Sequence, residues 1–409
     1  MDSGAAFGKR QFGRPAAYVP PIPPPRAKSK PSAVRSAVAP AMATPAARPL
    51  PIVTFALFSM LVLIFFLQEA YALGVPPGYS FNYRSLLALG ADNRILVEHG
   101  QWWRILTGAL LHANAGHLIG NGIVLVLVGL LLERLLGWGW FLAVFWVSAV
   151  AGSLASMYSV DPQTLGVGAS GGVMGLLSAT LVCSFHSASK GQRLRMRWLA
   201  ARLMIPALLP LGGDGANGGV HIDYSAHAGG ALAGAVMGIL MSAVWPEDSL
   251  LPQRRLTAEA AAVGGVVAAA IACVMVVLTY GGYQQISATL APDTAIPRST
   301  TEAVAAASGL SATYPQDPRL HFFVALGDEQ AGILGDAEHE LRTGLSETAQ
   351  LSELAPQSDL PLRALLAGVL LDEGRRADAK AEGDPLCHLL HPDKWLDDFL
   401  ERTLLCAPY

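Results

Sequence analysis

Residues 165–184 read LGVGASGGVMGLLSATLVCS and contain no charged side chain. An α-helix needs about 20 mostly apolar residues to cross the hydrocarbon core of a bilayer. Six other stretches are also apolar: 50–67, 117–136, 138–159, 198–212, 225–245 and 260–280. The sequence therefore predicts seven membrane-spanning helices. The stretch 198–212 is the weakest of them, because it is short and contains Arg202, Pro206 and Pro210.

The charge along the chain separates this apolar core from two polar ends. Residues 1–50 hold eight Lys or Arg and one acidic residue, residues 51–280 hold eleven and ten, and residues 281–409 hold nine and twenty. Charged residues make up 14% of the chain, against about 25% in ordinary soluble domains. This composition excludes a purely soluble enzyme and predicts an all-α, polytopic membrane protein.

The sequence predicts four segments. Residues 1–49 are rich in Pro, Ala and basic residues and bury too little apolar surface to fold, so we predict a disordered tail, with a Pro-rich docking ligand as the alternative. Residues 50–245 are predicted to form a six-helix core, and residues 246–283 a cytoplasmic loop and a seventh helix. Residues 284–409 are predicted to form an acidic, mostly helical region outside the cytoplasm.

The basic loops predict the orientation of the chain, because cytoplasmic loops are enriched in Lys and Arg. Seven spans place the basic tail, the turn at 190–197 and the loop at 254–255 on one side of the membrane. We therefore expect a cytoplasmic N-terminus and a periplasmic C-terminus, in a bacterial inner membrane. Cys387 and Cys406 could then pair, if their region faces an oxidising compartment.

Ionisable and polar side chains in membrane helices are costly, so each marks a candidate functional site. Ser170 and His227 lie near the starts of two predicted spans, and the predicted topology places both at the outer ends of their helices. A serine hydroxyl becomes nucleophilic when a neighbouring base takes its proton, and His227 can be that base. The sequence thus favours a nucleophile over a small packing residue at position 170.

Two further polar residues suit the oxyanion that such an attack would form. His117 and Asn121 are four residues apart, so both project from one face of a helix. With the backbone N–H of Ser170 they could provide the fixed donors that an oxyanion requires.

Glycines at four-residue spacing predict that the two catalytic helices pack closely. Small residues let membrane helices approach one another, and glycines beside the hydroxyl let backbone and substrate approach it. The residues concerned are Gly168, Gly171 and Gly175 around Ser170, and Gly230, Gly234 and Gly238 after His227.

Four motifs, in this order, resemble those of the rhomboid intramembrane serine proteases: Trp103-Arg104, His112-x4-His117-x3-Asn121, Gly168-Ala169-Ser170-Gly171 and Ala226-His227-x2-Gly230-x3-Gly234. The resemblance covers about residues 50–245, and the seventh helix is similar to that of the six-plus-one subgroup. It implies a Ser170–His227 dyad without a third acid, with His117 and Asn121 serving the oxyanion. It also implies mainly structural roles for the Trp-Arg pair and for His112.

The resemblance implies a serine endopeptidase that cuts single-pass transmembrane proteins within or next to their membrane segment. It implies no metal or organic cofactor, and we expect the lipid bilayer but no nucleic acid as a further partner. The acidic C-terminal region could bind a protein partner. Met174 stands where many bacterial members of the family carry a tyrosine that stacks on the histidine, and methionine can pack against an imidazole edge.

Other readings of these residues remain. A catalytically silent relative that binds transmembrane clients is the main alternative. A soluble hydrolase elbow would need a strand before Ser170, zinc binding would favour His-Glu-x-x-His, and a transporter would more often show two similar halves. We read Asp223 and His221 as solvated loop residues, and the loop 212–220 as either a flexible gate or a plain connector.

Overall fold

The protein is described here by a computed structural model, which describes residues 50–73, 81–160, 162, 164–186, 189–209, 222–249, 251–351, 359–389 and 394–406. The predicted tail at 1–49, the predicted gate at 212–220 and His221 lie outside these residues.

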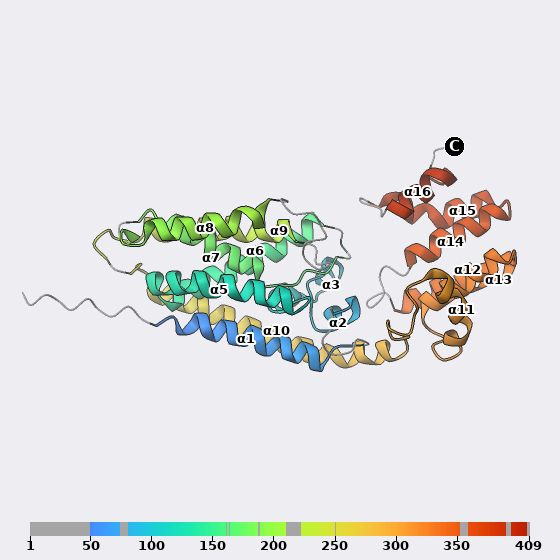
Figure 1. The fold of residues 1–409 in the computed structure, drawn as a ribbon, viewed down its shortest axis with the longest axis horizontal. Helices are drawn as coiled ribbons and strands as arrows, with labels where there is room; N and C mark the ends of the chain where they lie inside the picture. The colour runs from blue at the N-terminus through green and yellow to red at the C-terminus, as the bar shows by residue number, and fades with distance from the viewer. Residues whose placement is uncertain are drawn as a thin grey trace, which may run out of the picture. The chain divides into compact units, whose positions relative to one another are not determined.

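The described part of the chain is helical, and its helices up to residue 288 form the membrane core (Figure 1). They are α1 (Ile52–Ala70), α2 (Tyr83–Ala88), α3 (Arg94–Glu98), α4 (Arg104–Thr107), α5 (Ala115–Leu136), α6 (Trp138–Ser159), α7 (Ser170–Cys183), α8 (Arg193–Leu208), α9 (Tyr224–Ala243) and α10 (Arg255–Ala288). Helices α1, α5, α6, α9 and α10 are long and apolar enough to cross a bilayer. The prediction of an all-α, polytopic membrane protein is confirmed.

Two of the seven predicted spans are helices shorter than the 20 or so residues that cross a bilayer: α7 is shorter than its predicted stretch 165–184, and α8 begins five residues before its predicted stretch 198–212. Helix α7 has 14 residues and α8 has 16. Helix α7 begins only at Ser170, because the residues before it are held in a non-helical conformation. Gly168 has a φ of +123°, and its N–H donates to the carbonyl of Gly108 over 2.9 Å. Helix α10, in contrast, extends beyond both ends of the predicted stretch 260–280.

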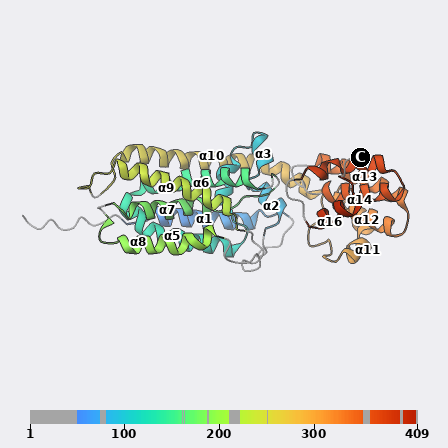
Figure 2. The same ribbon diagram turned by 90° about the horizontal axis from the view of Figure 1, so that it is seen from above.

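Helices α6, α7 and α9 pack against one another in the membrane core (Figure 2), and α7 packs most extensively on α9. The predicted glycine faces meet there. A Cβ added at Gly230 would lie 2.1 Å from the carbonyl oxygen of Gly171, and one at Gly234 would lie 2.1 Å from that of Gly175. Because real Cβ atoms essentially never come that close, glycine is required at this crossing for the helices to approach as they do.

Glu133 joins the membrane helices α1 and α5. Its buried carboxylate accepts hydrogen bonds from the backbone N–H of Val53 (3.0 Å) and from both the N–H (2.7 Å) and the hydroxyl (2.6 Å) of Thr54. These two N–H groups belong to the first turn of α1, where no intrahelical partner exists. Glu133 therefore caps α1 from a neighbouring helix.

The loop between α1 and α5 folds around the buried guanidinium of Arg104, which is 1% exposed. Its Nη1 donates to the carbonyls of Leu87 (2.7 Å) and Ala91 (3.0 Å), and its Nε donates to Gln101 (2.8 Å). Its Nη2 donates to the hydroxyl of Tyr283, on α10 (2.9 Å). Arg104 therefore joins several parts of this loop, which in turn pairs with the segment before α7: Asp92 and Gly166 exchange two backbone hydrogen bonds of 2.9 Å.

The residues after α10 form a separate set of small helices. They are α11 (Thr300–Ser311), α12 (Pro318–Gln330), α13 (Leu334–Gln350), α14 (Asp359–Asp372), α15 (Arg376–Gly383) and α16 (Lys394–Thr403). Each of α11 to α14 packs on the next helix in sequence, and α16 packs on α14. Gly374 forms the turn between α14 and α15 with a φ of +77°, and a disulfide joins Cys387 to Cys406.

Candidate active site

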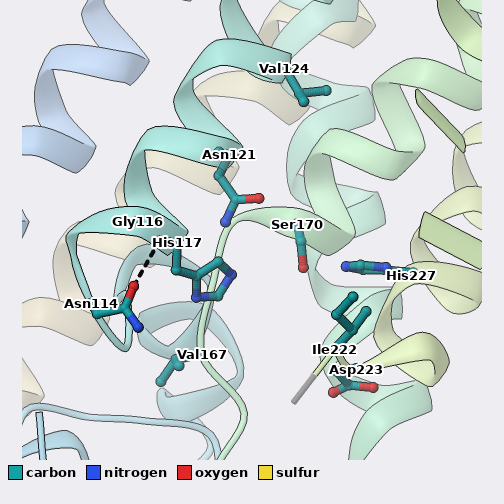
Figure 3. Close-up of a pocket in the computed structure, with 11 residues that line it drawn as sticks. Asn114, Gly116, His117, Asn121, Val124, Val167, Ser170, Ile222, Asp223 and His227 are labelled. Atoms are coloured by element: carbon teal, nitrogen blue, oxygen red, sulfur yellow. Dashed lines mark hydrogen bonds between the residues drawn. The ribbon is translucent and has the colours of Figure 1, made fainter. Parts of the chain in front are cut away.

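A cavity of about 530 Å³ opens between α5, α7 and α9, near the starts of these three helices. Its lining includes the four residues for which the sequence predicts chemistry: His117, Asn121, Ser170 and His227. Figure 3 shows the Ser170 hydroxyl between the ring of His227 on one side and Asn121 and His117 on the other. The structure thus brings together, from three helices, residues up to 110 positions apart in the chain.

Ser170 is the first residue of α7, and its position there has chemical consequences. The first N–H groups of a helix have no intrahelical acceptor, and the helix dipole places partial positive charge at this end. A negative charge that develops beside Ser170 is therefore favoured before any side chain contributes. The small residues on either side, Ala169 and Gly171, leave the hydroxyl accessible from the cavity.

His227 lies in the first turn of α9 with its ring directed towards Ser170 (Figure 3). Its Nδ1 is 2.7 Å from the carbonyl oxygen of Ala207, near the end of α8. Because a carbonyl only accepts, Nδ1 carries a proton, and a neutral ring then has its free lone pair on Nε2. No direct hydrogen bond joins the side chains of Ser170 and His227, as is common for catalytic pairs without bound substrate.

Asn121 is oriented by residues behind it. Its Nδ2 donates to Nε2 of His112 over 3.2 Å, and His112 is fully buried. Two hydrogen bonds of 3.1 Å tie the His112 backbone to the amide of Gln68, on α1. An amide nitrogen has two N–H groups, so Asn121 keeps one for the cavity. His112 therefore contacts Asn121 from the side away from the cavity, whose lining does not include it.

His117 is placed by the cap of its own helix and by a glycine opposite. The side chain of Asn114 caps α5 by accepting from the N–H of His117 over 2.9 Å. A Cβ added at Gly168 would lie 2.7 Å from Cε1 of His117. Glycine at 168 is therefore needed both for its positive φ and to leave room for this ring.

The remaining residues named by the sequence lie outside the cavity. Trp103 and Arg104 are buried in the first loop. Met174 is 3% exposed and belongs to the apolar core between the helices. It is not part of the lining of the cavity, so the substitution for tyrosine changes the packing behind the site.

Asp223 is a residue whose role the sequence reading missed. We read it as a solvated loop residue, and this was wrong: it is half-buried and lines the cavity. Its Oδ1 accepts from the N–H of Ala226 over 2.8 Å, which caps α9, and its Oδ2 accepts from the hydroxyl of Ser156, on α6. An acidic residue directly before an apolar helix is a recognised cap signal and could have indicated this position.

Among the described residues no group of three or more His, Cys, Asp or Glu side chains is arranged to hold a metal ion.

Comparison with known proteins identifies the class of this core. Residues 99–244 match the Rhomboid domain family. The chain is 33% identical over 185 residues to rhomboid protease GluP of Bacillus subtilis (strain 168). It is 27% identical over 210 residues to rhomboid protease AarA of Providencia stuartii, and 32% identical over 188 residues to rhomboid-like protease 1 of Toxoplasma gondii. Residues 99–244 of the chain therefore carry a Rhomboid domain.

These similarities concern the membrane core. They cover 45% of this chain and 34% of GluP, 46% and 71% for AarA, and 46% and 62% for the Toxoplasma protein. The chain thus spans about a third of the length of GluP and larger parts of the other two.

Proposed function

We propose that this protein is an intramembrane serine endopeptidase that acts through a Ser170–His227 dyad. One observation carries the proposal: Ser170 begins α7 inside a polar cavity, with His227 on one side and Asn121 and His117 on the other. The names of the relatives, which call them rhomboid proteases, support the same class of activity.

The chemistry follows from this placement. The Ser170 hydroxyl attacks a peptide carbonyl while Nε2 of His227 takes its proton. Asn121, His117 and the N–H of Ser170 stabilise the oxyanion of the tetrahedral intermediate. His227 then gives the proton to the leaving amine, and an acyl-enzyme on Ser170 remains. Water attacks this ester with His227 again as base, which releases the second product and restores the hydroxyl.

The substrates proposed are membrane-anchored proteins, cut within or next to their transmembrane segment. The cavity lies among helices whose outward faces are apolar, so a helix held in lipid can reach it laterally while water reaches it from the open end. The rival function is a catalytically silent protein that binds such clients. It would use the same cavity but would not require a reactive hydroxyl.

A fluorophosphonate probe separates the two. The purified protein should be labelled at Ser170, and Ser170→Ala and His227→Ala should each abolish both labelling and cleavage of a transmembrane substrate. Ser178→Ala is the matched control, because Ser178 lies two turns further along α7 and its buried hydroxyl bonds only the carbonyl of Gly175. Cleavage by Ser170→Ala at the wild-type rate would overturn the mechanism.

We also propose that the N-terminus is cytoplasmic and that the C-terminal region faces an oxidising compartment, in a bacterial inner membrane. The basic loops support this orientation. The Cys387–Cys406 disulfide supports it too, because such bonds persist outside the cytoplasm. A membrane-impermeant reagent applied to intact cells should reach tags after residue 290 and miss tags in the loop at 246–254.

The acidic region at 284–409 is proposed to bind a protein partner or the substrate itself. A chain shortened after residue 290 should then keep cleaving a generic transmembrane substrate and lose rate on its native one. Equal cleavage of both would remove this role.

A further inference from the structure

The feature of interest is the contact between His227 and the end of α8. Nδ1 of His227 lies 2.7 Å from the backbone carbonyl oxygen of Ala207, the second-last residue of α8. Among the described residues the partner of Nδ1 is this carbonyl and not an acidic side chain, although Asp223, the N-cap of α9, is only four positions before His227. The two carboxylate oxygens of Asp223 are engaged by Ala226 and Ser156.

The chemistry of this end of α8 suits a histidine. The last four carbonyls of an α-helix have no intrahelical donor, and that of Ala207 is one of them. The aligned peptide dipoles also place partial negative charge at a helix C-terminus, which stabilises a nearby imidazolium. A single backbone group can therefore fix the tautomer of a histidine and favour its protonated form. Those are the two effects that a carboxylate has in a catalytic triad.

We propose that the C-terminal end of α8, through the carbonyl of Ala207, positions His227 for catalysis in place of a third acidic residue. This inference rests on the proposed function of His227 as the base. Met174 lies behind the site, so hydrogen bonding by α8 provides an orientation of the ring that does not depend on aromatic stacking. Ala207 is a positioning residue, because it touches the base and not the substrate.

The end of α8 that carries Ala207 is only partly buried: Leu203, Met204, Ala207 and Leu208 pack against the apolar core without being fully buried. The buried side chains of α8 are Met196 and Ala200, both in its first half. The half that carries Ala207 has none, and α8 packs mainly on α7 and only sparsely on α9. The alignment of His227 therefore depends on a helix end that is less firmly packed than the helices carrying the dyad.

The test replaces the peptide bond between Ala207 and Leu208 by an ester, through incorporation of the α-hydroxy analogue of leucine at 208. An ester carbonyl is a weaker acceptor than an amide carbonyl. We expect kcat to fall about tenfold, the change that corresponds to one hydrogen bond, with KM nearly unchanged. The pH–rate profile of the ester variant should differ from that of the wild type. The other ionisable groups near His227 are His117 across the cavity and Asp223 below it, and both are unaltered.

The matched control is an ester between Leu203 and Met204, one turn earlier in α8. It removes the same kind of helical N–H but leaves the acceptor of His227 intact. If the two ester variants have the same kcat and pH profile, the positioning role is wrong.

A second readout does not need activity. In Ser170→Ala protein with ¹⁵N-labelled histidine, NMR should show His227 protonated at Nδ1, and the ester at 208 should shift the ring towards the Nε2–H tautomer. An Nε2–H ring in the protein without esters would overturn the inference whatever the enzyme does. An Nδ1–H ring in a protein that cleaves nothing would uphold the contact and contradict only the proposed function.

Discussion

Arg104 donates a hydrogen bond from Nη2 to the hydroxyl of Tyr283 over 2.9 Å, and the two residues are 179 positions apart. Arg104 belongs to the first loop and Tyr283 to the end of α10, the helix added to the six-helix core. Through Arg104 this helix supports the carbonyls of Leu87 and Ala91, directly before Asp92, which pairs with the segment leading to Ser170. The last membrane helix is thus part of the frame that holds the segment leading to Ser170.

Tyr283→Phe should destabilise the protein, because it removes the acceptor of a charged and fully buried donor. A hydrogen bond to a charged group contributes about 1.5–3 kcal/mol, so the midpoint of thermal unfolding in detergent should fall by several degrees. Tyr280→Phe is the control, since its hydroxyl bonds the carbonyl of Tyr71 at an exposed position. A loss no greater than that of the control would contradict this role of α10.

Gly234→Ala should lower activity through the spacing of two helices. The new Cβ would meet the carbonyl oxygen of Gly175 at 2.1 Å, and this atom belongs to backbone that cannot move aside alone. Helices α7 and α9 must then separate, which carries His227 away from Ser170. We expect kcat to fall by at least about tenfold, since small misplacements of catalytic groups are costly.

The control for this substitution is Gly264→Ala, in α10, where an added Cβ meets nothing within 4 Å. It should fold as the wild type does and cleave at the wild-type rate. If Gly234→Ala folds and retains full activity, as judged by gel filtration and a cleavage assay, the close crossing is not required.

The sequence predicts the helical membrane core well because a bilayer imposes a simple rule on composition. Apolar stretches of about 20 residues located α1, α5, α6 and α9, and the four-residue spacing of glycines located the contact of α7 with α9. This rule does not predict the ends of α7 and α8, which have 14 and 16 residues and are shorter than a typical membrane-spanning helix. The start of α7 is set by the positive φ of Gly168 and by the pairing of the preceding segment with the first loop, and neither has a signature in hydropathy.

Four residues of the lining were also predictable, since Ser170, His227, His117 and Asn121 carry their chemistry in their side chains. What could not be predicted are the groups that orient them. The group that orients His227 is the backbone carbonyl of Ala207. Every residue has such a carbonyl, so the residue type at 207 does not indicate this role. The contact of Arg104 with Tyr283 joins residues too distant for any local pattern to relate.

The disulfide predicts how the C-terminal region responds to reduction. Cys387 and Cys406 are 19 positions apart and enclose α16, and closing a loop of about this length stabilises a fold by about 3 kcal/mol in the chain-entropy account. The pair Cys387→Ser and Cys406→Ser should make residues after 383 sensitive to limited proteolysis and leave the membrane core resistant.

Mass spectrometry of the fragments checks this outcome, and Cys183→Ser, in α7 and outside any disulfide, is the control. Protection of α16 that persists without the disulfide would show that packing on α14 alone is sufficient.

Asp92 predicts that stability depends on pH. The residue is 2% exposed, and its Oδ1 lacks a hydrogen-bond partner among the described residues. Burial raises the pKa of Asp92 to about 8. The attraction of Arg104 lowers this pKa, and the repulsion of Asp223 raises it by a smaller amount. In the unfolded chain the pKa is near 3.8. Between about pH 4 and pH 8 the folded protein therefore holds a proton that the unfolded protein has lost, so the free energy of unfolding falls as pH rises through this range.

Asp92→Asn removes the titrating group and should flatten this part of the curve. At pH 8 the variant should unfold at a higher temperature than the wild type, and near pH 4 the difference should be small. Thermal unfolding in detergent from pH 4 to pH 9 measures both, with Asp248→Asn, an exposed carboxylate, as the control. Because the backbone of Asp92 still pairs with Gly166 in the variant, a folding defect is not expected. Parallel curves for wild type and Asp92→Asn would mean that the carboxyl group is ionised in the folded protein and is stabilised there by Arg104.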